Sequence, residues 1–426
     1  MSRIAVIGTG YVGLTTGACF AHVGHEVVCA DIDGAKVAML QRGEVPILEA
    51  GLDNLVREGI DGGRLSFVVG ARNAVADCEF AYLCVPTPQD VDGSADLSYI
   101  EDAAREIGPV LPSEAIVVNK STVPVGSTRV VERALGRSDV AVVSNPEFLR
   151  EGSAIHDFLN PDRIVIGAED QAAAVRVASL YLGITAPVIV TDPASAETIK
   201  YAANAFLATK ISFINAVAAV CEAVGADIKD VALGMGYDSR IGHEFLRPGP
   251  GWGGSCFPKD TRAMIRIAED AGYDFNLLKG VVTVNDEQLN RVADKVVASA
   301  GGSVDGKRIA AWGLTFKART DDVRESPSLA VLQRLRDRGA VIRAFDPAVK
   351  EDQHVLDGIE VVADPYAAVE GAEVLVVLTE WDEFRWLDVD KLAELMASKK
   401  VVDARNLLDR AALTRRGFDY LGVGRS

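Results

Sequence analysis

The fold is decided by residues 3–31, which read RIAVIGTGYVGLTTGACFAHVGHEVVCAD. A short apolar run leads into Gly8, Gly10 and Gly13, and a proline-free apolar segment and a second apolar run then end at Asp31. This order predicts strand, glycine turn, helix and strand, the βαβ unit of a dinucleotide-binding sheet. Gly8 would make the tight turn, Gly10 would admit a pyrophosphate against bare backbone, and Gly13 would let the helix approach the strand.

The acidic residue that ends the second strand predicts which dinucleotide binds. Asp31 would accept hydrogen bonds from the adenosine ribose hydroxyls, which favours NAD over NADP. Lys36 is expected beside the ribose or the pyrophosphate, and Tyr11 and Val12 complete the cofactor-binding turn. The alternative is an accidental glycine loop, and it is disfavoured because the position, the flanking runs and the acid all agree.

The strand and helix pattern continues beyond this unit. Apolar runs at residues 79–85, 115–119 and 140–144 extend a parallel α/β sheet, and residues 192–225 contain no glycine before Gly225 and one proline at their start, which predicts one long helix. A second strand–loop–helix–strand segment follows at residues 308–345. We therefore expect an α/β protein with two Rossmann-like parallel-sheet domains joined by a long central helix and a helical domain: 1–191 (NAD-binding), 192–302 (helical, dimerisation) and 303–426 (the second Rossmann-like domain).

The second α/β segment lacks the glycine fingerprint of the first. Its loop at residues 313–317 reads GLTFK and presents side chains where the first loop presents bare backbone. Its ligand should therefore differ from that of the first.

Composition excludes several classes of function. The 426 residues carry 44 Lys plus Arg against 61 Asp plus Glu, a net charge of −17, which would repel nucleic acid. The six cysteines form no CxxC pair and the five histidines no HxxxH or HExxH spacing, so no metal is expected. The N-terminus does not resemble a signal peptide and no apolar run approaches the roughly 20 residues of a membrane helix, so we expect a cytoplasmic protein with no membrane partner.

Loops at the carboxyl ends of strands are the expected ligand sites of an open α/β sheet. Pro86 and Thr87 follow one strand, Ser121 and Thr122 follow the next, and Thr122 is expected to face the cofactor. The alternative is ordinary turn chemistry, since Thr-Pro and Ser-Thr steps are common in turns.

Two polar pairs stand out further along the chain. Glu147 and Glu151 would share one face if their segment turned helically, and either could hold a water or the cofactor; a solvated acidic turn is the alternative. Lys200 and Asn204 lie one turn apart on the long predicted helix, so both project to the same side. The lysine could meet an oxyanion that the asparagine orients, whereas the plain alternative is a solvated surface lysine.

The most informative stretch is RPGPGWGGSCFPKD at residues 247–260. Cys256 stands just before a predicted helix whose first turn contains Pro258, and the unpaired amides and dipole there would activate the thiol as a nucleophile. Asp260 lies in the same turn and Lys259 adds local positive charge. A structural thiol is the alternative, but such a thiol seldom lies in a glycine-rich loop.

At these residues the chain resembles the UDP-glucose/GDP-mannose dehydrogenase family, over nearly its whole length. The segment GGSCFPKD is the form typical of the members that oxidise UDP-glucose, whereas those that oxidise UDP-N-acetylmannosamine typically carry histidine in place of Ser255. Trp252 departs from the Phe or Tyr that is frequent at its position. The resemblance implies a cytoplasmic NAD-dependent oxidation of UDP-glucose to UDP-glucuronate in two hydride transfers, through a thiohemiacetal and a thioester on Cys256.

The resemblance also implies individual residue roles. Lys200 and Asn204 would stabilise the oxyanion, while Asp260, Glu147 and Thr122 organise water and proton transfers. A homodimer is implied, in which Arg240 reaches the neighbouring subunit's substrate. The implied cofactor contacts further include Glu151, Lys259 and Arg324, and the implied substrate contacts are Phe148, Leu149, Arg150, Glu151, Phe245, Arg247, Gly251, Trp252, Gly253, Phe316, Lys317 and Arg405.

Other functions remain open at this point. GDP-mannose, TDP-glucose or UDP-N-acetylmannosamine could be the substrate, because nucleotide and sugar selection depends on loop contacts. A two-electron β-hydroxyacid dehydrogenase also joins a Rossmann domain to a helix with Lys and Asn one turn apart, but it needs neither Cys256 nor a second α/β domain. A non-catalytic NAD sensor would leave the activated thiol without a purpose.

Overall fold

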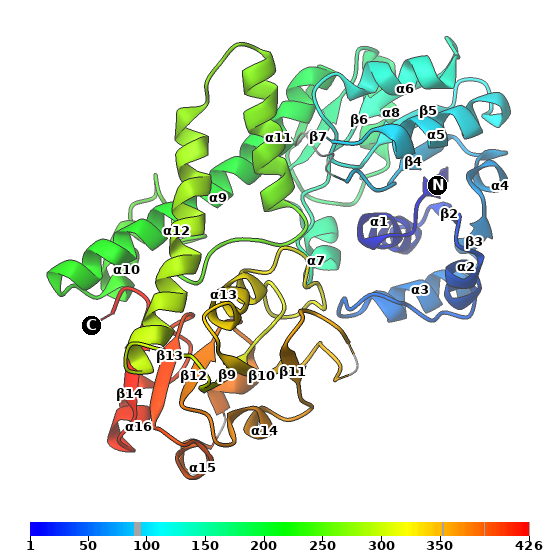
Figure 1. Ribbon diagram of the computed structural model, residues 1–426. Coiled ribbons are helices and arrows are strands. Elements are labelled where there is room, and N and C mark those ends of the chain that lie inside the picture. The colour runs from blue at the N-terminus through cyan, green and yellow to red at the C-terminus, as the bar shows by residue number, and fades with distance from the viewer. Residues whose placement is uncertain (89–94, 352, 387, 426) are drawn as a thin grey trace. The chain divides into compact units, whose positions relative to one another are not determined.

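The computed structural model describes residues 1–88, 95–351, 353–386 and 388–425, and the chain divides into two compact units (Figure 1). The first unit comprises residues 1–203 and 262–271, and the second comprises residues 204–261 and the chain from residue 272 onward. Each unit contains one sheet. The two units are described separately below.

The first unit is built on an eight-stranded sheet in the order β3-β2-β1-β4-β5-β6-β7-β8. Its pairs are parallel except β6 with β7, which meet antiparallel through Ser144 and Gly167. The strands are β1 Arg3–Ile7, β2 Glu26–Asp31, β3 Leu65–Val69, β4 Phe80–Leu83, β5 Ile116–Asn119, β6 Ala141–Ser144, β7 Ile164–Gly167 and β8 Val188–Thr191. The parallel part confirms the predicted sheet, whereas β7 and β8 were not anticipated.

Helices connect these strands and cover the sheet. They are α1 Tyr11–His22, α2 Gly34–Gln41, α3 Leu52–Asp61, α4 Ala71–Val75, α5 Ser98–Ile107, α6 Ser127–Leu135, α7 Ala154–Leu159 and α8 Gln171–Ser179, with a 3-10 turn at Gly108–Val110. The long helix α9, Pro193–Val224, follows β8. Its bounds confirm the predicted helix, since its only proline stands at the first position, where the missing N–H costs nothing.

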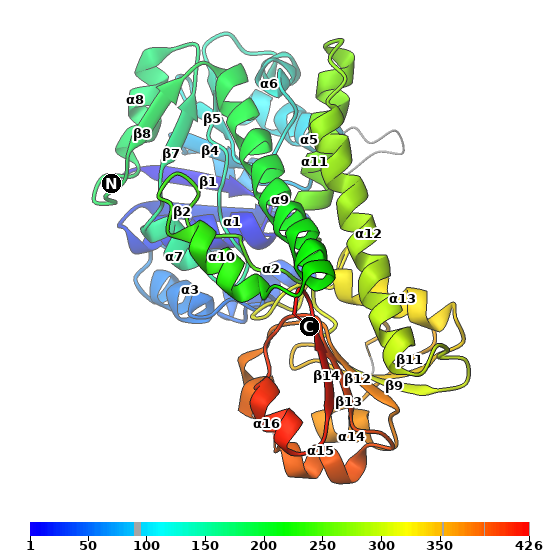
Figure 2. The same cartoon turned by 90° about the vertical axis from the view of Figure 1, so that its left-hand side faces the viewer.

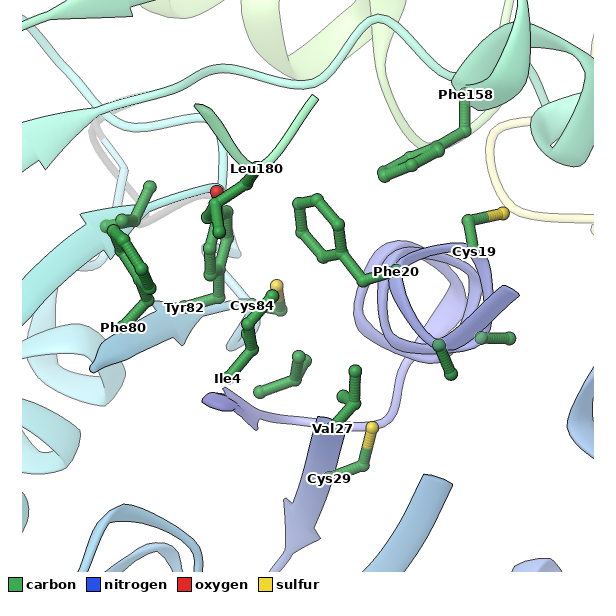
Figure 3. Close-up of a cluster of buried hydrophobic side chains, with 14 of the residues drawn as sticks. Ile4, Cys19, Phe20, Val27, Cys29, Phe80, Tyr82, Cys84, Phe158 and Leu180 are labelled. Carbon is green, nitrogen blue, oxygen red and sulfur yellow. The ribbon is translucent and has the colours of Figure 1, made fainter. Parts of the chain in front are cut away.

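Both faces of the first sheet are buried, as the period of a strand requires. Ile4 and Val6 of β1 belong to one apolar core, and the alternate residues Ala5 and Ile7 belong to the other. Phe20 of α1 lies in the first core (Figure 3), where its ring meets Phe158 edge to face at 5.1 Å. This apolar packing therefore holds the helices against the sheet next to the glycine turn.

The second unit combines helices with a six-stranded parallel sheet in the order β11-β10-β9-β12-β13-β14. The strands are β9 Arg308–Trp312, β10 Val341–Phe345, β11 Ile359–Val361, β12 Val374–Val377, β13 Lys400–Asp403 and β14 Asp419–Gly422. The helices are the remainder of α9, α10 Ile228–Gly236, the start of α11 Phe257–Asp270, α12 Asn276–Ser299, α13 Pro327–Arg336, α14 Pro365–Val369, α15 Val389–Leu395 and α16 Arg410–Arg415, with a 3-10 turn at Asp382–Trp386. Figure 2 shows α12 running along this sheet beside α13.

The two sheets repeat one local frame. The N–H of Gly8 donates to Ala30 O at 2.8 Å, and the N–H of Gly313 donates to Phe345 O at the same distance. A carboxylate then holds each loop, because Asp31 accepts from the N–H of Thr9 at 3.0 Å and Asp346 accepts from the N–H of Thr315 at 3.0 Å. The second strand–loop–helix–strand segment predicted at residues 308–345 thus repeats the hydrogen bonds of the first.

The length and hydropathy of α9 would also suit a membrane span, contrary to the expectation that no apolar segment approaches that length. About a third of its most apolar window is buried. Core helices of soluble proteins meet the same criteria, and Glu197 and Lys200 lie buried within its first turns. The composition of this helix is therefore weak evidence for a membrane.

Candidate active site

The glycine turn of the first unit has the geometry that a dinucleotide needs. Gly8 adopts a φ of +95°, and a Cβ there would lie 2.6 Å from Cys84 O. A Cβ on Gly13 would lie 1.9 Å from Gly8 O, so only glycine lets α1 approach the strand this closely. A Cβ on Gly10 would meet no atom within 4 Å, and no side chain caps α1 at this residue. Bare backbone at an uncapped helix N-terminus fits the pyrophosphate of NAD.

Asp31, the acid expected to bind the adenosine ribose, is held in position by hydrogen bonds. Its Oδ2 accepts from the N–H and hydroxyl of Thr9 at 3.0 and 2.5 Å, and from Lys36 Nζ at 3.1 Å. Burial raises the pKa of Asp31, but the hydrogen bonds from Thr9, the Asp33 N–H and Lys36 outweigh burial and lower it to about 2. The carboxylate is therefore ionised at any physiological pH. Lys36 pairs with this acid, and its expected place beside the ribose or the pyrophosphate stays a prediction.

The loops after β4 and β5 lie together. The Thr87 hydroxyl donates to Thr122 O at 2.9 Å, and the Ser121 hydroxyl donates to Val85 O at 2.7 Å. Both hydroxyls thus serve turn hydrogen bonds, while Thr122 is buried and Pro86 is exposed. This contact joins two of the loops that were predicted to hold the cofactor.

The loop after β6 carries a buried ion pair. Lys200 Nζ of α9 donates to Glu147 Oε1 at 2.8 Å, and both side chains are 5% exposed. Phe148 packs beside the pair, with Lys200 Nζ 5.4 Å from the ring centroid and Arg163 3.7 Å from it on the pocket side. Lys200 is therefore not a solvated surface lysine.

The predicted helical turn at Glu147 and Glu151 is wrong. Residues 145–150 form no helix, so the four-residue spacing does not place the two carboxylates on one face. Glu147 instead folds back, and its Oε2 accepts from the Leu149 N–H at 2.6 Å. Glu151 is half-buried in the turn that follows.

Several cations keep the buried Glu147 ionised. Burial raises the pKa of Glu147, but the Lys200 ammonium first, and then the Leu149 N–H and the Lys120 ammonium, bring it below its usual value. The carboxylate can thus accept a proton or hold a water without first losing one of its own.

A second acid, which the sequence did not single out, supports this loop. Glu49 is 6% exposed, and it accepts from the Gly152 N–H at 2.7 Å and the Ala154 N–H at 2.8 Å. The Tyr11 hydroxyl also donates to it. Glu49 therefore ties the glycine turn to the loop that carries Phe148 to Glu151.

In the second unit, the predicted nucleophile stands at a helix N-terminus. Cys256 is half-buried directly before α11, and its carbonyl accepts from the Asp260 N–H at 2.9 Å. Asp260 is buried and accepts from Asn204 Nδ2 at 2.6 Å and from Lys259 Nζ at 2.5 Å. Cysteine, acid and amide are thus assembled within the same unit.

Buried amide side chains hold the glycine-rich loop before Cys256. Asn285 exchanges two hydrogen bonds with the Trp252 backbone at 2.8 and 3.0 Å, and Trp252 Nε1 donates to Ser212 Oγ at 2.9 Å. Asn215 accepts from the Gly249 N–H at 2.9 Å. Only tryptophan supplies this ring N–H, which accounts for the departure at that position, and sequence reasoning missed the supporting residues because they lie more than thirty positions away.

The same loop packs tightly on the C-terminal sheet. A Cβ on Gly253 would lie 2.0 Å from Glu325 O, and one on Gly254 would lie 2.7 Å from the Phe316 ring. Arg405 Nε donates to Leu378 O at 2.8 Å and its Nη2 to Phe316 O at 3.3 Å. Phe316, Arg405 and the cysteine loop, which the sequence placed in one site, therefore adjoin one another within the second unit.

The other predicted residues of this unit range from exposed to buried. Arg240 is exposed and forks Asp238 through Nε and Nη2 at 2.9 and 2.6 Å. Arg324 is exposed and pairs with Asp322 at 2.7 Å, and Lys317 Nζ lies 5.3 Å from the Phe316 ring centroid. The remaining positions are Arg247, exposed; Phe245, whose ring lies 6.3 Å from that of Phe257; and Gly251, with a φ of +138°.

No cluster of His, Cys, Asp or Glu that would suit a metal occurs among the residues that the structure describes. Cys19, Cys29, Cys78, Cys84 and Cys221 are buried thiols.

Three family models match successive parts of the chain. They are described as the NAD binding domain (residues 2–185), the central domain (194–287) and the UDP binding domain (310–410) of one family. The chain belongs to the UDP-glucose/GDP-mannose dehydrogenase family. As a member, it is an NAD-dependent oxidoreductase.

Similar members of this family are known in bacteria and in an archaeon. The UDP-glucose 6-dehydrogenase of Rhizobium meliloti is 47% identical, with 99% of each chain covered. The UDP-glucose 6-dehydrogenase TuaD of Bacillus subtilis is 46% identical, with 100% of this chain and 94% of that one covered. The UDP-glucose dehydrogenase of Pyrobaculum islandicum is 40% identical, with 100% and 98% covered and a TM-score of 0.92.

For this dehydrogenase, substitutions at two glycines of the predicted NAD turn should have different effects, one on stability and the other on cofactor binding. Gly13→Ala drives a methyl group into Gly8 O and should lower the free energy of unfolding by about 3 kcal/mol or more. Gly10→Ala meets no protein atom and should change stability by less than about 1 kcal/mol, yet weaken NAD roughly tenfold because the methyl group stands where the pyrophosphate approaches. Urea unfolding and calorimetric NAD titration measure both. A Gly10→Ala protein that binds NAD as tightly as the parent would contradict this assignment.

Proposed function

We propose that this chain oxidises the C6 alcohol of UDP-glucose to the carboxylate of UDP-glucuronate, consuming two NAD and one water. The observation that carries the proposal is Cys256 at the N-terminus of α11, with Asp260 beside it and Asn204 bonded to that acid. A reaction that stops at an aldehyde or ketone needs no nucleophilic thiol. Oxidation of an alcohol to an acid through a thioester does need one.

The chemistry follows from the residues. When bound, NAD would supply the hydride acceptor for both oxidations. The Cys256 thiolate adds to the aldehyde carbon to form a thiohemiacetal, whose oxidation leaves a thioester. Water then cleaves the C–S bond, releasing the carboxylic acid and returning the thiol. Lys200 and Asn204 would stabilise the oxyanion, and Asp260, Glu147 and Thr122 would organise the water and the proton transfers.

The remaining roles are proposed from the same match. The glycine turn, Asp31 and Lys36 would hold NAD, together with the loops bearing Thr87 and Ser121. UDP-glucose would be held by Phe148 to Glu151, Phe316, Lys317, Arg405 and the loop from Arg247 to Gly253. Arg324 would contact the cofactor.

The wider organisation is also part of the proposal. We divide the chain into an NAD-binding domain (1–191), a helical dimerisation domain (192–302) and a UDP-sugar-binding domain (303–426). The protein would act in the cytoplasm as a homodimer, with Arg240 reaching the partner's substrate. In a single chain that arginine is exposed and pairs with its neighbour Asp238, so it has a surface position from which to reach out.

The test is the number of NADH formed per UDP-glucuronate, followed by absorbance and chromatography. Two NADH per acid support the proposal. One NADH with no acid would favour a two-electron dehydrogenase, and turnover only with UDP-N-acetylmannosamine, GDP-mannose or TDP-glucose would reassign the sugar. NAD binding without turnover of any of these sugars would contradict an enzymatic role.

A further inference from the structure

A buried lysine that has no assigned role lies beside Glu147. Lys120, at the end of β5, is 5% exposed, and its Nζ donates to Asn145 Oδ1 at 3.1 Å and Tyr181 Oη at 3.3 Å. Tyr181 in turn donates to Asn145 Oδ1 at 2.6 Å, and Asn145 Nδ2 donates to Val165 O at 2.8 Å. The ammonium is thus held in one place by a closed network.

Both hydrogen-bond partners of Lys120 are neutral, yet a buried ammonium requires a counter-charge. Lys120 makes no ion pair within 4.0 Å among the residues that the structure describes. Glu147 lines the same cavity in the first unit, and its pKa is lowered by the Lys120 charge as well as by Lys200. Two ammonium groups therefore share one buried carboxylate.

The other groups around Glu147 do not alter this balance. Arg163 lies over the Phe148 ring, 3.7 Å from its centroid, and Asp157 is already paired with Arg150 at 2.6 Å. Burial raises the pKa of the Cys84 thiol to about 12, so that group is neutral. The charged or titratable groups that face Glu147 are thus Lys200 from α9, Lys120 after β5, Tyr181 after α8, Cys84 after β4, Arg163 before β7 and Asp157 from α7.

From this arrangement we infer that Lys120 is a positioning residue, a second counter-ion that keeps Glu147 ionised while Lys200 turns to the substrate oxyanion. The inference rests on the proposed function, in which the Lys200 ammonium also serves the substrate oxyanion. If Lys200 were the sole cation near Glu147, turning it to the oxyanion would leave the buried carboxylate with the Leu149 N–H but without a counter-charge, and the pKa of Glu147 would rise. Lys120 is fixed to Asn145 and Tyr181 and does not move with Lys200.

The test is the pH profile of kcat for UDP-glucose oxidation by the full-length protein. Lys120→Met removes the charge, so the pKa of Glu147 in the enzyme–substrate complex rises and the acidic limb should move upward by about one pH unit. At pH values below that limb, kcat of Lys120→Met should be about tenfold lower than kcat of the parent. Lys120→Arg keeps the charge and should restore the limb. Tyr181→Phe removes one acceptor but leaves the charge, and should leave the limb in place.

An acidic limb that stays where it is in folded Lys120→Met would overturn the inference. If that variant does not fold, Asn145→Asp provides the same test, because its carboxylate captures the Lys120 charge and should raise the limb equally. Absence of turnover in the parent would sink the proposed function alone. The role of Lys120 can then be tested by NMR of carboxyl-labelled protein, which measures the pKa of Glu147 in the parent and in Lys120→Met; Glu147→Gln assigns the signal. A higher pKa in Lys120→Met supports the counter-ion role, and an unchanged pKa excludes it.

Discussion

Cys256→Ser should lower the rate of UDP-glucuronate formation on the order of 10⁴-fold or more, because the hydroxyl is a far weaker nucleophile at neutral pH. The first oxidation needs no thiol, so bound aldehyde or a slowly hydrolysed ester should accumulate, and mass spectrometry of the quenched protein would detect the ester. NADH per UDP-glucose should fall from two towards one or less. The overall fold should survive, since Cys256 is only half-buried.

Cys221→Ala is the matched control. Cys221 is 3% exposed in the core of the second unit and belongs to no proposed catalytic role. Its loss should cost some stability but leave two NADH per substrate. A Cys256→Ser protein that still forms the acid at a rate within tenfold of the parent would refute the covalent route.

Lys200→Met should reduce kcat roughly 10³-fold and also destabilise the first unit, two effects with different causes. The rate falls because the proposed oxyanion loses its cation. Stability falls by about 3–5 kcal/mol because Glu147, 5% exposed, keeps its charge without its 2.8 Å partner. Urea unfolding and steady-state kinetics measure the two losses separately.

The double variant Lys200→Met, Glu147→Gln separates these effects. It removes the stranded charge and should recover most of the stability but none of the rate. The stability lost in the single variant should depend on pH: Lys200 lowers the folded-state pKa of Glu147, so the parent gains stability from the pair above the unfolded pKa of Glu147, and the difference between parent and variant should shrink at acidic pH, where Glu147 is protonated in both. If the double variant is no more stable than the single one, the ion pair is not the cause.

The fold was predictable where local residues determine it. The spacing of Gly8, Gly10, Gly13 and Asp31 defines a βαβ unit, and the uninterrupted run after Pro193 defines α9. Strands β7 and β8 were missed because they lack such a signature; length is not the reason, since the predicted strands β4, β5 and β6 are also four residues long. The antiparallel step between β6 and β7 depends on how the chain returns to the sheet edge.

The site was predictable only for residues whose chemistry is local. Cys256 could be identified from the glycines that precede it and from Pro258. Glu49 and Lys120 do not, because their partners lie 103 and 25 positions away, and no periodicity connects such distances. Spacing also misled at Glu147 and Glu151, where backbone and packing contacts, not helical turns, place the carboxylates.

The two sheets use their shared frame differently. In the first sheet, Asp31 holds its loop and stays partly open at the predicted ribose. In the second, Asp346 holds the equivalent loop and is 1% exposed, and it also accepts a hydrogen bond from Trp381 Nε1 at 3.2 Å. The same carboxylate hydrogen bond therefore serves two ends: in the first sheet it positions an acid that a ligand can still reach, and in the second it only fixes the loop.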